Sequence, residues 1–388
     1  MKTSQIIVFF AVFFTIYFLV NGYIFIRGWQ ALPSGTSWRL AYAIAFSVAA
    51  LAFIIGRFLE RVWLSPVSVA FVWIGSFWLA AMLYFFLAVV VLDVVRLANA
   101  VIPFYPQWVT EHYIAFKQWV LCAIVGVVGI SLLAGHINAI MPQTVDLSIE
   151  ISKPLPGNRP LVIAMASDIH LGTIIGRWRL ARLVDHLNSL DPDLILLPGD
   201  IVDEDLGPVI NANLGEQLRG LRARYGVYAV PGNHEWIGGV DRAVAYLQEH
   251  GITVLRDSVL TVAGGVMLVG REDRTFRRAD GTGRKSIPEL LVGKDVSQPI
   301  IVMDHQPFGL SEASDAHVDL QVSGHTHHGQ LWPFNLITKA IYEDSWGYIV
   351  KGTTHIYVSS GYGTWGPPVR LGNRPEVVRM TMGGSGGR

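Results

Sequence analysis

Residues 161–170 read LVIAMASDIH, an apolar run that leads directly into an aspartate and a histidine. The apolar part, 161–166, is typical of a short buried strand, and Asp168 and His170 stand where that strand ends. Residues 177–190 then have helical spacing, and residues 194–197 form a second apolar strand that leads into Asp200. Strands that alternate with helices predict an open α/β sheet, whose ligands bind beyond the carboxyl ends of the strands.

Three further clusters of the same kind follow later in the chain. Strands at 226–230, 300–303 and 320–322 lead into residues 232–235 (GNHE), residues 304–305 (DH) and residues 324–327 (GHTH). Further strands are expected over 261–269 and 354–359. Each cluster alone is a weak or moderate signal, but all of them in order, each directly after a strand, indicate one common site.

The ligand chemistry of these clusters points to metal ions. They offer carboxylate, imidazole and amide groups and no sulfur, which suits Mn, Fe, Zn or Co rather than a structural zinc centre. The ligands are too many for one tetrahedral ion and sufficient for two. Two divalent ions would hold a phosphate between them and lower the pKa of a bridging water toward neutrality. The sequence therefore predicts a two-metal hydrolytic site.

The order D-x-H, G-D, G-N-H-E, H and G-H-T-H resembles the signature of the calcineurin-like metallophosphoesterase superfamily over residues 161–382. The last block continues through residue 330 (GHTHHGQ), and a Gly-rich segment follows at 359–363. Both features resemble the membrane-associated bacterial branch, with its YkuE-type phosphodiesterases and, more distantly, hydrolases of UDP-2,3-diacylglucosamine. The resemblance implies a four-layer αββα sandwich.

The resemblance also implies a role for each matching residue. The implied metal ligands are Asp168, His170 and His327 for the first ion, Asn233, His305 and His325 for the second, and Asp200 as the bridge between them. His234 would act as general acid on the leaving-group or phosphate oxygen, and Glu235 would orient it. The implied cofactors are two divalent ions, with Mn²⁺ expected and Fe, Zn or Co as alternatives.

Other residues are candidates for reading the substrate. Arg271 and Arg274 stand in an arginine-rich loop that would make bidentate phosphate contacts or, equally, form a solvated surface. His328 would contact the substrate or lie exposed without binding a metal ion. Apolar residues at 332–334 and 348–349 would form a wall for acyl chains or pack in the core.

The first half of the chain predicts a membrane domain. A helix needs about 20 mainly apolar residues to cross the hydrocarbon core. Four long apolar runs are present: 6–26, 40–55, 62–92 and 119–140. Buried helices of a soluble protein are disfavoured because these runs leave no polar face to meet water. We therefore expect a four-span domain over 1–142, a metal domain over 146–382, and a flexible tail or cloning remnant over 383–388.

Charge and cysteine content exclude some classes of protein. The formal net charge is zero, so nothing indicates a nucleic-acid partner, and the single cysteine, Cys122, excludes an intrachain disulfide. The positively charged residues that flank the spans fall on both sides: Lys2, Arg57 and Arg61 on one, and Arg27, Arg39, Arg96 and Lys117 on the other. Orientation and oligomeric state stay open. By resemblance we favour the bacterial inner membrane with the metal domain in the cytoplasm.

Three functions are compatible with this organisation. The first is a membrane-bound phosphodiesterase or pyrophosphatase on an amphiphilic, lipid-linked substrate such as UDP-2,3-diacylglucosamine. The second is a phosphoesterase on a soluble or cell-wall substrate, with the membrane half as an anchor. Removal of residues 1–140 would distinguish them: activity that survives on soluble diesters but is lost on lipids would favour the first function. The third, a transporter or sensor with a regulatory metal domain, is disfavoured because the spans carry few ionisable residues and the catalytic set is intact.

Overall fold

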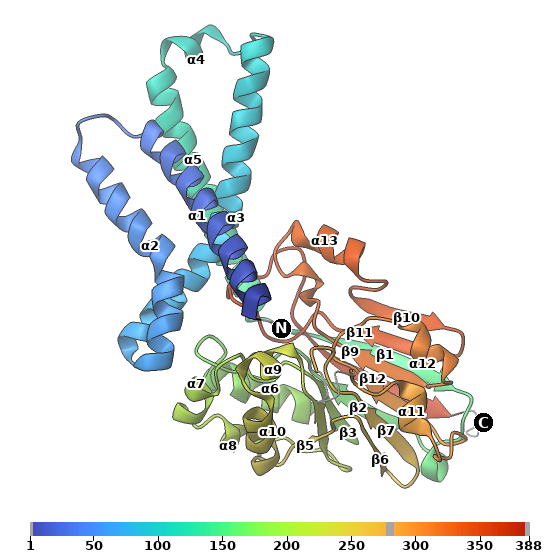
Figure 1. Cartoon of the computed structure of the whole chain (residues 1–388). Coiled ribbons are helices and arrows are strands. Elements are labelled where there is room, and N and C mark those ends of the chain that lie inside the picture. Colours follow the sequence, from blue (N-terminus) through green and yellow to red (C-terminus); the bar gives the residue numbers. More distant parts are fainter. Residues whose placement is uncertain (1–2, 277–282, 385–388) are drawn as a thin grey trace. The chain divides into compact units, whose positions relative to one another are not determined.

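A computed structural model describes residues 3–276 and 283–384. The chain divides into two compact units, Met1–Gly135 and His136–Arg388 (Figure 1). This division falls before residue 142, where we expected the boundary. At the other end, β12 (Glu376–Gly384) includes Gly383 and Gly384. These two residues are therefore part of a sheet and not of a tail, and residues 385–388 lie outside the described part.

The first unit is helical, as predicted. Its long helices are α1 (Thr3–Ala31), α2 (Ser37–Val62), α3 (Pro66–Val101) and α5 (Tyr113–Ala139), and the short α4 (Gln107–Glu111) precedes α5. All four long helices are long and apolar enough to cross a membrane, α1 from Ala11 onward. The Ser65 side chain caps α3 by accepting a hydrogen bond from the Ser68 amide, and Pro66 occupies the first turn, where its missing N–H costs nothing.

Small residues and buried polar contacts hold these helices together. A Cβ atom at Gly75 of α3 would lie 2.2 Å from the Phe53 amide nitrogen of α2, so only glycine permits this approach. The Tyr17 hydroxyl donates to the Ala50 carbonyl (2.5 Å), and the Trp78 indole donates to the Asn21 side chain (2.9 Å). Because lipid tails offer no such partners, these contacts favour one arrangement of α1, α2 and α3.

The second unit contains two six-stranded sheets. The first has the order β1 (Gln143–Ile151), β12, β2 (Leu161–Met165), β3 (Leu194–Pro198), β4 (Val227–Val230) and β5 (Thr253–Val254). The second has the order β10 (Gly347–Lys351), β11 (Thr354–Val358), β9 (Leu320–Ser323), β8 (Ile300–Met303), β7 (Val266–Gly270) and β6 (Ser258–Val262). Both sheets are mixed: β2 pairs antiparallel to β12 and parallel to β3, and β7 pairs antiparallel to β6 and parallel to β8.

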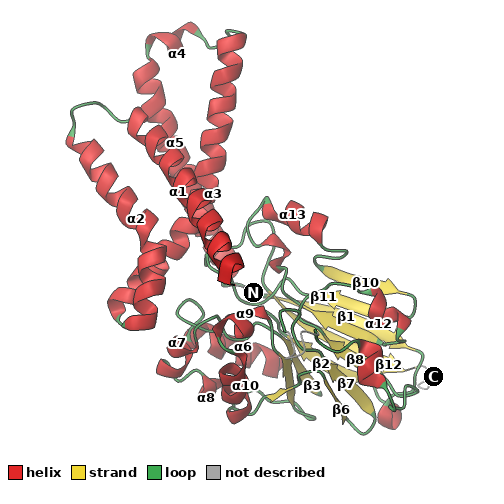
Figure 2. Ribbon diagram, viewed as in Figure 1, coloured by secondary structure: helices red, strands yellow, loops and turns green. Residues whose placement is uncertain are grey.

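The two sheets pack face to face between two layers of helices (Figure 2). Alternate residues of each strand point to opposite faces, so Ile163 lies between the sheets while Ala164 faces the helices. The helices on the first sheet are α6 (Arg177–Ser189), α7 (Leu206–Asn211), α8 (Gly215–Leu218) and α10 (Val240–Glu249), and those on the second are α11 (Ile287–Leu291) and α12 (Ser311–Asp315). This confirms the predicted four-layer αββα sandwich.

Candidate metal centre

The loops after β2, β3, β4, β8 and β9 converge at one edge of the sandwich. The ligand atoms of one group lie within 4.8 Å of one another, and so do those of a second group: Asp168, His170 and His327 in the first, and Asp200, His305 and His325 in the second. His325 is half-buried and the others are buried. Each group combines residues from both sheets, so the site forms only when the sandwich is assembled.

Asp200 joins the two groups. Its Oδ2 atom lies 3.1 Å from Nε2 of His305 in the second group and 3.9 Å from Nε2 of His170 in the first. Its Oδ1 atom accepts a hydrogen bond from the His234 amide (2.9 Å), which fixes the plane of the carboxylate. The Oδ2 atom of Asp200 therefore faces both groups, as an oxygen of a bridging ligand would.

The first group leaves polar atoms without partners. Nε2 of His170 lies 3.0 Å from Nε2 of His327, and Nε2 of His327 lies 3.6 Å from Oδ1 of Asp168. Among the described residues, Oδ2 of Asp168 and Nδ1 of His170 are buried with no hydrogen-bond partner. Buried polar atoms are normally satisfied, so these residues fit a bound cation.

The second group is oriented by its surroundings. Nδ1 of His305 donates to the Pro198 carbonyl (2.9 Å), which leaves the lone pair on Nε2. That Nε2 atom lies 3.1 Å from Oδ1 of Asn233, so the side chain expected as a further ligand lies beside this group. Burial, and then the neighbouring His305, lower the pKa of His325 to about 4. Its imidazole is therefore neutral, the form that binds metal.

The charges of the site favour a cation. Burial raises the pKa of Asp168, whereas His305 lowers the pKa of Asp200 although burial opposes this. Asp200 in turn raises the pKa of His305 well above its usual value, again against the effect of burial. The proton that these shifts favour in the metal-free site is therefore held on the His305 ring beside Asp200. Divalent ions would supply that positive charge and stabilise the buried acids.

The backbone at the ligands is strained. Asp168, His170, Asp200, His325 and His327 all have φ between 47° and 73°, the left-handed region that non-glycine residues rarely adopt. Such conformations cost about 1–3 kcal/mol each and persist where the surrounding structure enforces them. Gly199, at φ 88°, completes the loop before Asp200, and a Cβ atom there would lie 2.4 Å from Nδ1 of His305. The loops thus bring the ligands close together.

Known proteins with similar sequences support this interpretation. The profile of the family described as calcineurin-like phosphoesterase matches residues 161–329. A Helicobacter pylori (strain J99) protein named uncharacterized metallophosphoesterase is 35% identical over 227 residues, 58% of this chain and 60% of that protein. An Aquifex aeolicus protein of the same name is 32% identical over 255 residues, 65% of this chain and 95% of that protein. The chain belongs to the calcineurin-like metallophosphoesterase family.

A vertebrate relative shares the combination of membrane and phosphoesterase. The zebrafish "transmembrane protein with metallophosphoesterase domain" is 31% identical over 281 residues, 69% of this chain and 63% of that protein. The match spans less than two thirds of the zebrafish and H. pylori proteins. The predicted family and the multi-pass membrane character are confirmed. The family and the clustered ligands imply divalent metal ions.

In the phosphoesterase unit, Asp203 and not Glu235 orients the histidine expected to act as acid. Nδ1 of His234 lies 3.1 Å from Oδ1 of Asp203, and this carboxylate raises the pKa of His234 to about 9, although burial would lower it. Glu235 instead accepts hydrogen bonds from the amides of Asp200 (3.1 Å), Val202 (2.8 Å) and Gly232 (2.7 Å). The assignment of Glu235 is corrected: it holds the loop that carries Asp200. No motif in the sequence marks Asp203.

His327 is supported by residues that the sequence analysis did not single out. The buried guanidinium of Arg370 lies 3.2 Å from Nδ1 of His327 and donates to the carbonyls of Gly361 and Gly363. Asn138, in the last turn of α5, donates to the carbonyls of Arg370 (3.0 Å) and Asn373 (2.6 Å). His327 is therefore held by residues distant in sequence, including one at the end of the last span.

Two predicted substrate contacts are wrong. Arg271 is 5% exposed and pairs with Asp304 (3.0 Å) and Glu312 (2.8 Å), so it is a buried structural cation. His328 is buried and not exposed. The centroid of its ring lies 5.1 Å from that of Trp346, and its Nδ1 atom lies 3.3 Å from the Ser345 hydroxyl, so the side chain contacts these two residues and not the site.

Arg274 remains a candidate substrate contact. Its exposed guanidinium stacks over the Phe308 ring at 4.3 Å, Phe308 packs on Tyr342 at 4.7 Å, and Tyr342 lies 6.0 Å from the ring of His325. This row leads from the second group of ligands to the surface. Residues 277 and 278 of the same arginine-rich loop lie outside the described residues.

Proposed function

We propose that the chain is a membrane-bound, two-metal phosphoesterase that hydrolyses a phosphodiester or pyrophosphate bond in an amphiphilic, lipid-linked substrate. The observation that carries this proposal is the position of Asp200, whose Oδ2 atom faces both groups of ligands. A carboxylate shared in this way suits two neighbouring ions and has no use at a mononuclear site. The other ligands proposed for the ions are those named above from the family pattern.

The chain's own residues would position the reacting groups. Two divalent ions, with Mn²⁺ proposed, would supply Lewis acidity and an activated water at the phosphorus. His234, fixed through Nδ1 by Asp203, keeps Nε2 available to donate a proton to the leaving oxygen. Its ring lies 4.6 Å from that of His170, so this proton donor stands beside the first group of ligands.

An exposed apolar helix beside the metal ligands supports an amphiphilic substrate. Helix α13 (Phe334–Ile341) follows the loop of His327 and ends at Tyr342, next to His325. Leu336 is 60% exposed, Ile337 53% and Ile341 57%. Contiguous exposed apolar side chains mark lipid or protein contacts, and this chain carries four helices that can span a membrane. The expected wall at 332–334 and 348–349 is also in part exposed, at Trp332, Phe334 and Tyr348.

The experiment is product analysis by mass spectrometry with the detergent-solubilised full chain and Mn²⁺. UDP-2,3-diacylglucosamine, its deacylated counterpart and a generic soluble diester would be compared, with Asp200→Ala as control. We expect UMP and the acylated sugar phosphate from the first compound, faster than any product from the second. Because the nucleotide-linked lipid is available on the cytoplasmic face, this result would also favour a cytoplasmic metal unit in the inner membrane.

The alternatives correspond to distinct outcomes. Equal rates on acylated and deacylated compounds, or cleavage of the soluble diester alone, would favour a soluble or cell-wall substrate with the membrane unit as anchor. No turnover of any ester by metal-loaded chain would overturn the enzymatic proposal and favour a metal-dependent sensor or transporter.

A further inference from the structure

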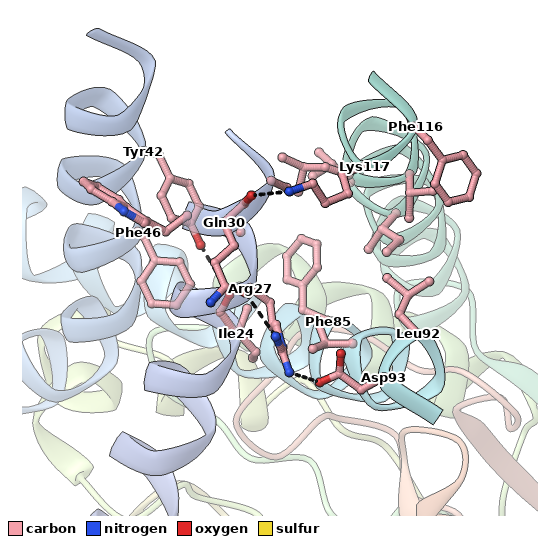
Figure 3. A pocket seen from close by; sticks show the side chains of 18 of the residues that line it. Ile24, Arg27, Gln30, Tyr42, Phe46, Phe85, Leu92, Asp93, Phe116 and Lys117 are labelled. Carbon is pink, nitrogen blue, oxygen red and sulfur yellow. Dashed lines mark hydrogen bonds and ion pairs between the residues drawn. The ribbon is translucent and has the colours of Figure 1, made fainter. Parts of the chain in front are cut away.

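The membrane unit contains a cavity of about 840 Å³ that the phosphoesterase site does not use. It is lined by residues of α1, α2, α3 and α5 (Figure 3). Tyr105, in the segment before α4, also belongs to the lining. A volume of this size is typical of pockets that enclose a small organic ligand. All lining residues belong to the first unit and all proposed metal ligands to the second, so the cavity is a separate site.

The lining carries an excess of positive charge. Four cations and one carboxylate line the cavity, which leaves three net positive charges: Arg27, Arg39, Arg96 and Lys117 against Asp93. These residues stand near the C-terminal ends of α1 and α3 and the N-terminal ends of α2 and α5. In helices that alternate in direction, such ends meet at the same edge of the membrane. The topology thus collects cations that are dispersed in the sequence.

Asp93 compensates only part of this charge. It pairs with Arg27 at 2.5 Å and with Arg96 at 3.3 Å, and it accepts a hydrogen bond from Tyr23. Nε of Arg27 is buried and has no hydrogen-bond partner within the described part of the chain. An unsatisfied buried donor beside an open cavity indicates a missing acceptor.

Arg39 and Lys117 have neutral hydrogen-bond partners. Arg39 donates to the Leu32 carbonyl at 3.0 Å, and Lys117 donates to the Gln30 carbonyl at 3.1 Å (Figure 3 shows the latter). Each cation also lies over an aromatic ring, Arg39 over Trp29 at 5.1 Å and Lys117 over Tyr113 at 5.3 Å. These contacts hold the two side chains in place at the cavity, and neither cation pairs with a carboxylate within residues 3–276 and 283–384.

The rest of the lining is apolar. Aromatic side chains such as Phe46, Trp78 and Phe85 and aliphatic ones such as Leu92 and Ile124 make up its wall. Phe46 and Trp78 pack edge to face with ring centroids 4.9 Å apart. The cavity therefore combines a cationic group at a membrane edge with an apolar wall, which matches an amphiphile with an anionic head and hydrocarbon chains.

We propose that this cavity binds an anionic phospholipid, with the phosphate at Arg27, Arg39 and Lys117 and an acyl chain along the apolar wall. Charge-assisted bonds from guanidinium and ammonium groups to phosphate hold the head. The proposal is independent of the phosphoesterase reaction. The Asp200→Ala variant should therefore bind the lipid with the same affinity as the wild-type chain.

The test uses the delipidated full chain in a non-ionic detergent. Phosphatidylglycerol, phosphatidylcholine with the same acyl chains, and inorganic phosphate are each titrated, and bound lipid is counted by native mass spectrometry. We expect phosphatidylglycerol to bind at least about tenfold more tightly than phosphatidylcholine, the effect of roughly one retained charge contact. Equal binding of both lipids overturns the proposal. Binding of inorganic phosphate as tight as that of the lipid overturns the acyl-chain part and assigns a phosphate site.

Matched variants locate the effect. Arg39→Gln and Lys117→Gln should each weaken phosphatidylglycerol binding by about tenfold. Arg61→Gln, an exposed arginine at the other end of the same helix α2, should leave it unchanged. Lys117→Arg keeps the charge and should retain binding, which separates charge from folding effects. Equal losses in Arg39→Gln and Arg61→Gln would place the lipid elsewhere and overturn the proposal.

Discussion

The metal centre and the membrane cavity are two polar sites with opposite needs. At the metal centre, the buried carboxylates of Asp168 and Asp200 face imidazoles, and the arrangement favours added positive charge. In the cavity, cations outnumber the single carboxylate, and the arrangement favours added negative charge. The first site is built from contiguous motifs at strand ends, whereas the second is built from isolated residues at helix ends. A site without a motif can thus be as definite in its charge as one with a family signature.

The comparison breaks most directly if the metal centre works without Asp200, the carboxylate proposed to bridge its ions. Asp200→Ala should lower the metal content below two ions per chain and slow hydrolysis by about 10³-fold or more. Both effects are expected because Asp200 faces both groups of ligands. Metal content by mass spectrometry and turnover of a generic diester measure them. Asp185→Ala, an exposed aspartate on α6, is the matched control. Full activity in Asp200→Ala would refute the two-metal assignment.

His234 sharpens the distinction between ligands and proton donors. His234→Ala should keep both ions and slow turnover by about 10²-fold, the usual scale for loss of a general acid. The measurement is kcat together with bound metal. Loss of metal in this variant would instead make His234 a ligand.

Asp203 tests which residue orients that proton donor. Asp203→Asn should lower kcat by about tenfold to 10²-fold with both ions retained, because the ring of His234 loses its charged partner. Glu235→Gln should instead disturb metal content, because Glu235 holds the amide of Asp200. The reverse pattern would restore Glu235 as the orienting residue.

Arg370 tests whether cations have a structural role at the metal centre. Arg370→Lys should weaken metal affinity by about tenfold, since lysine cannot reach the carbonyls of Gly361 and Gly363 and the ring of His327 together. Metal titration followed by activity measures it. Arg379→Lys, an arginine with a 44% exposed side chain on β12, is the control. Equal affinity in both variants would show that His327 needs no such support.

The smallest effect concerns α13. Leu336→Ser with Ile337→Ser should reduce kcat/KM on an acylated substrate by about threefold, because part of the apolar contact is lost, and should leave the soluble diester unchanged. Val292→Ser, at a 78% exposed apolar position elsewhere on the unit, is the control. An equal loss on both substrates would mean that α13 supports the fold and not the lipid.

Much of the candidate metal centre could be predicted because its clustered side chains closely follow buried strands. Asp168, Asp200 and His305 came from local patterns that need no knowledge of distant contacts. Arg370 could not be found in this way, because it lies 43 residues from His327 and reaches it only through the fold. Asp203 was missed because it lies three residues beyond the Gly-Asp motif that follows β3, and no motif of its own marks it.

The limits of the fold prediction have similar causes. Residues 261–269 were predicted as one strand, but Ala263, Gly264 and Gly265 have positive φ and form a turn that divides β6 from β7. β12 comes from the end of the chain and inserts between β1 and β2, a pairing that no local pattern indicates. The membrane cavity depends on which helix ends meet, and single basic residues near span ends carry no signal of that.

The last turn of α5 has a practical consequence for anyone who wishes to study the phosphoesterase in soluble form. His136 donates to the Pro368 carbonyl, and Asn138 donates to the segment that holds His327. Cutting the chain at residue 140, the natural choice from hydropathy, would delete both anchors along with the spans. Weak activity in such a fragment would then be mistaken for a need for the bilayer. A fragment that begins before His136 would keep these anchors and answer the question fairly.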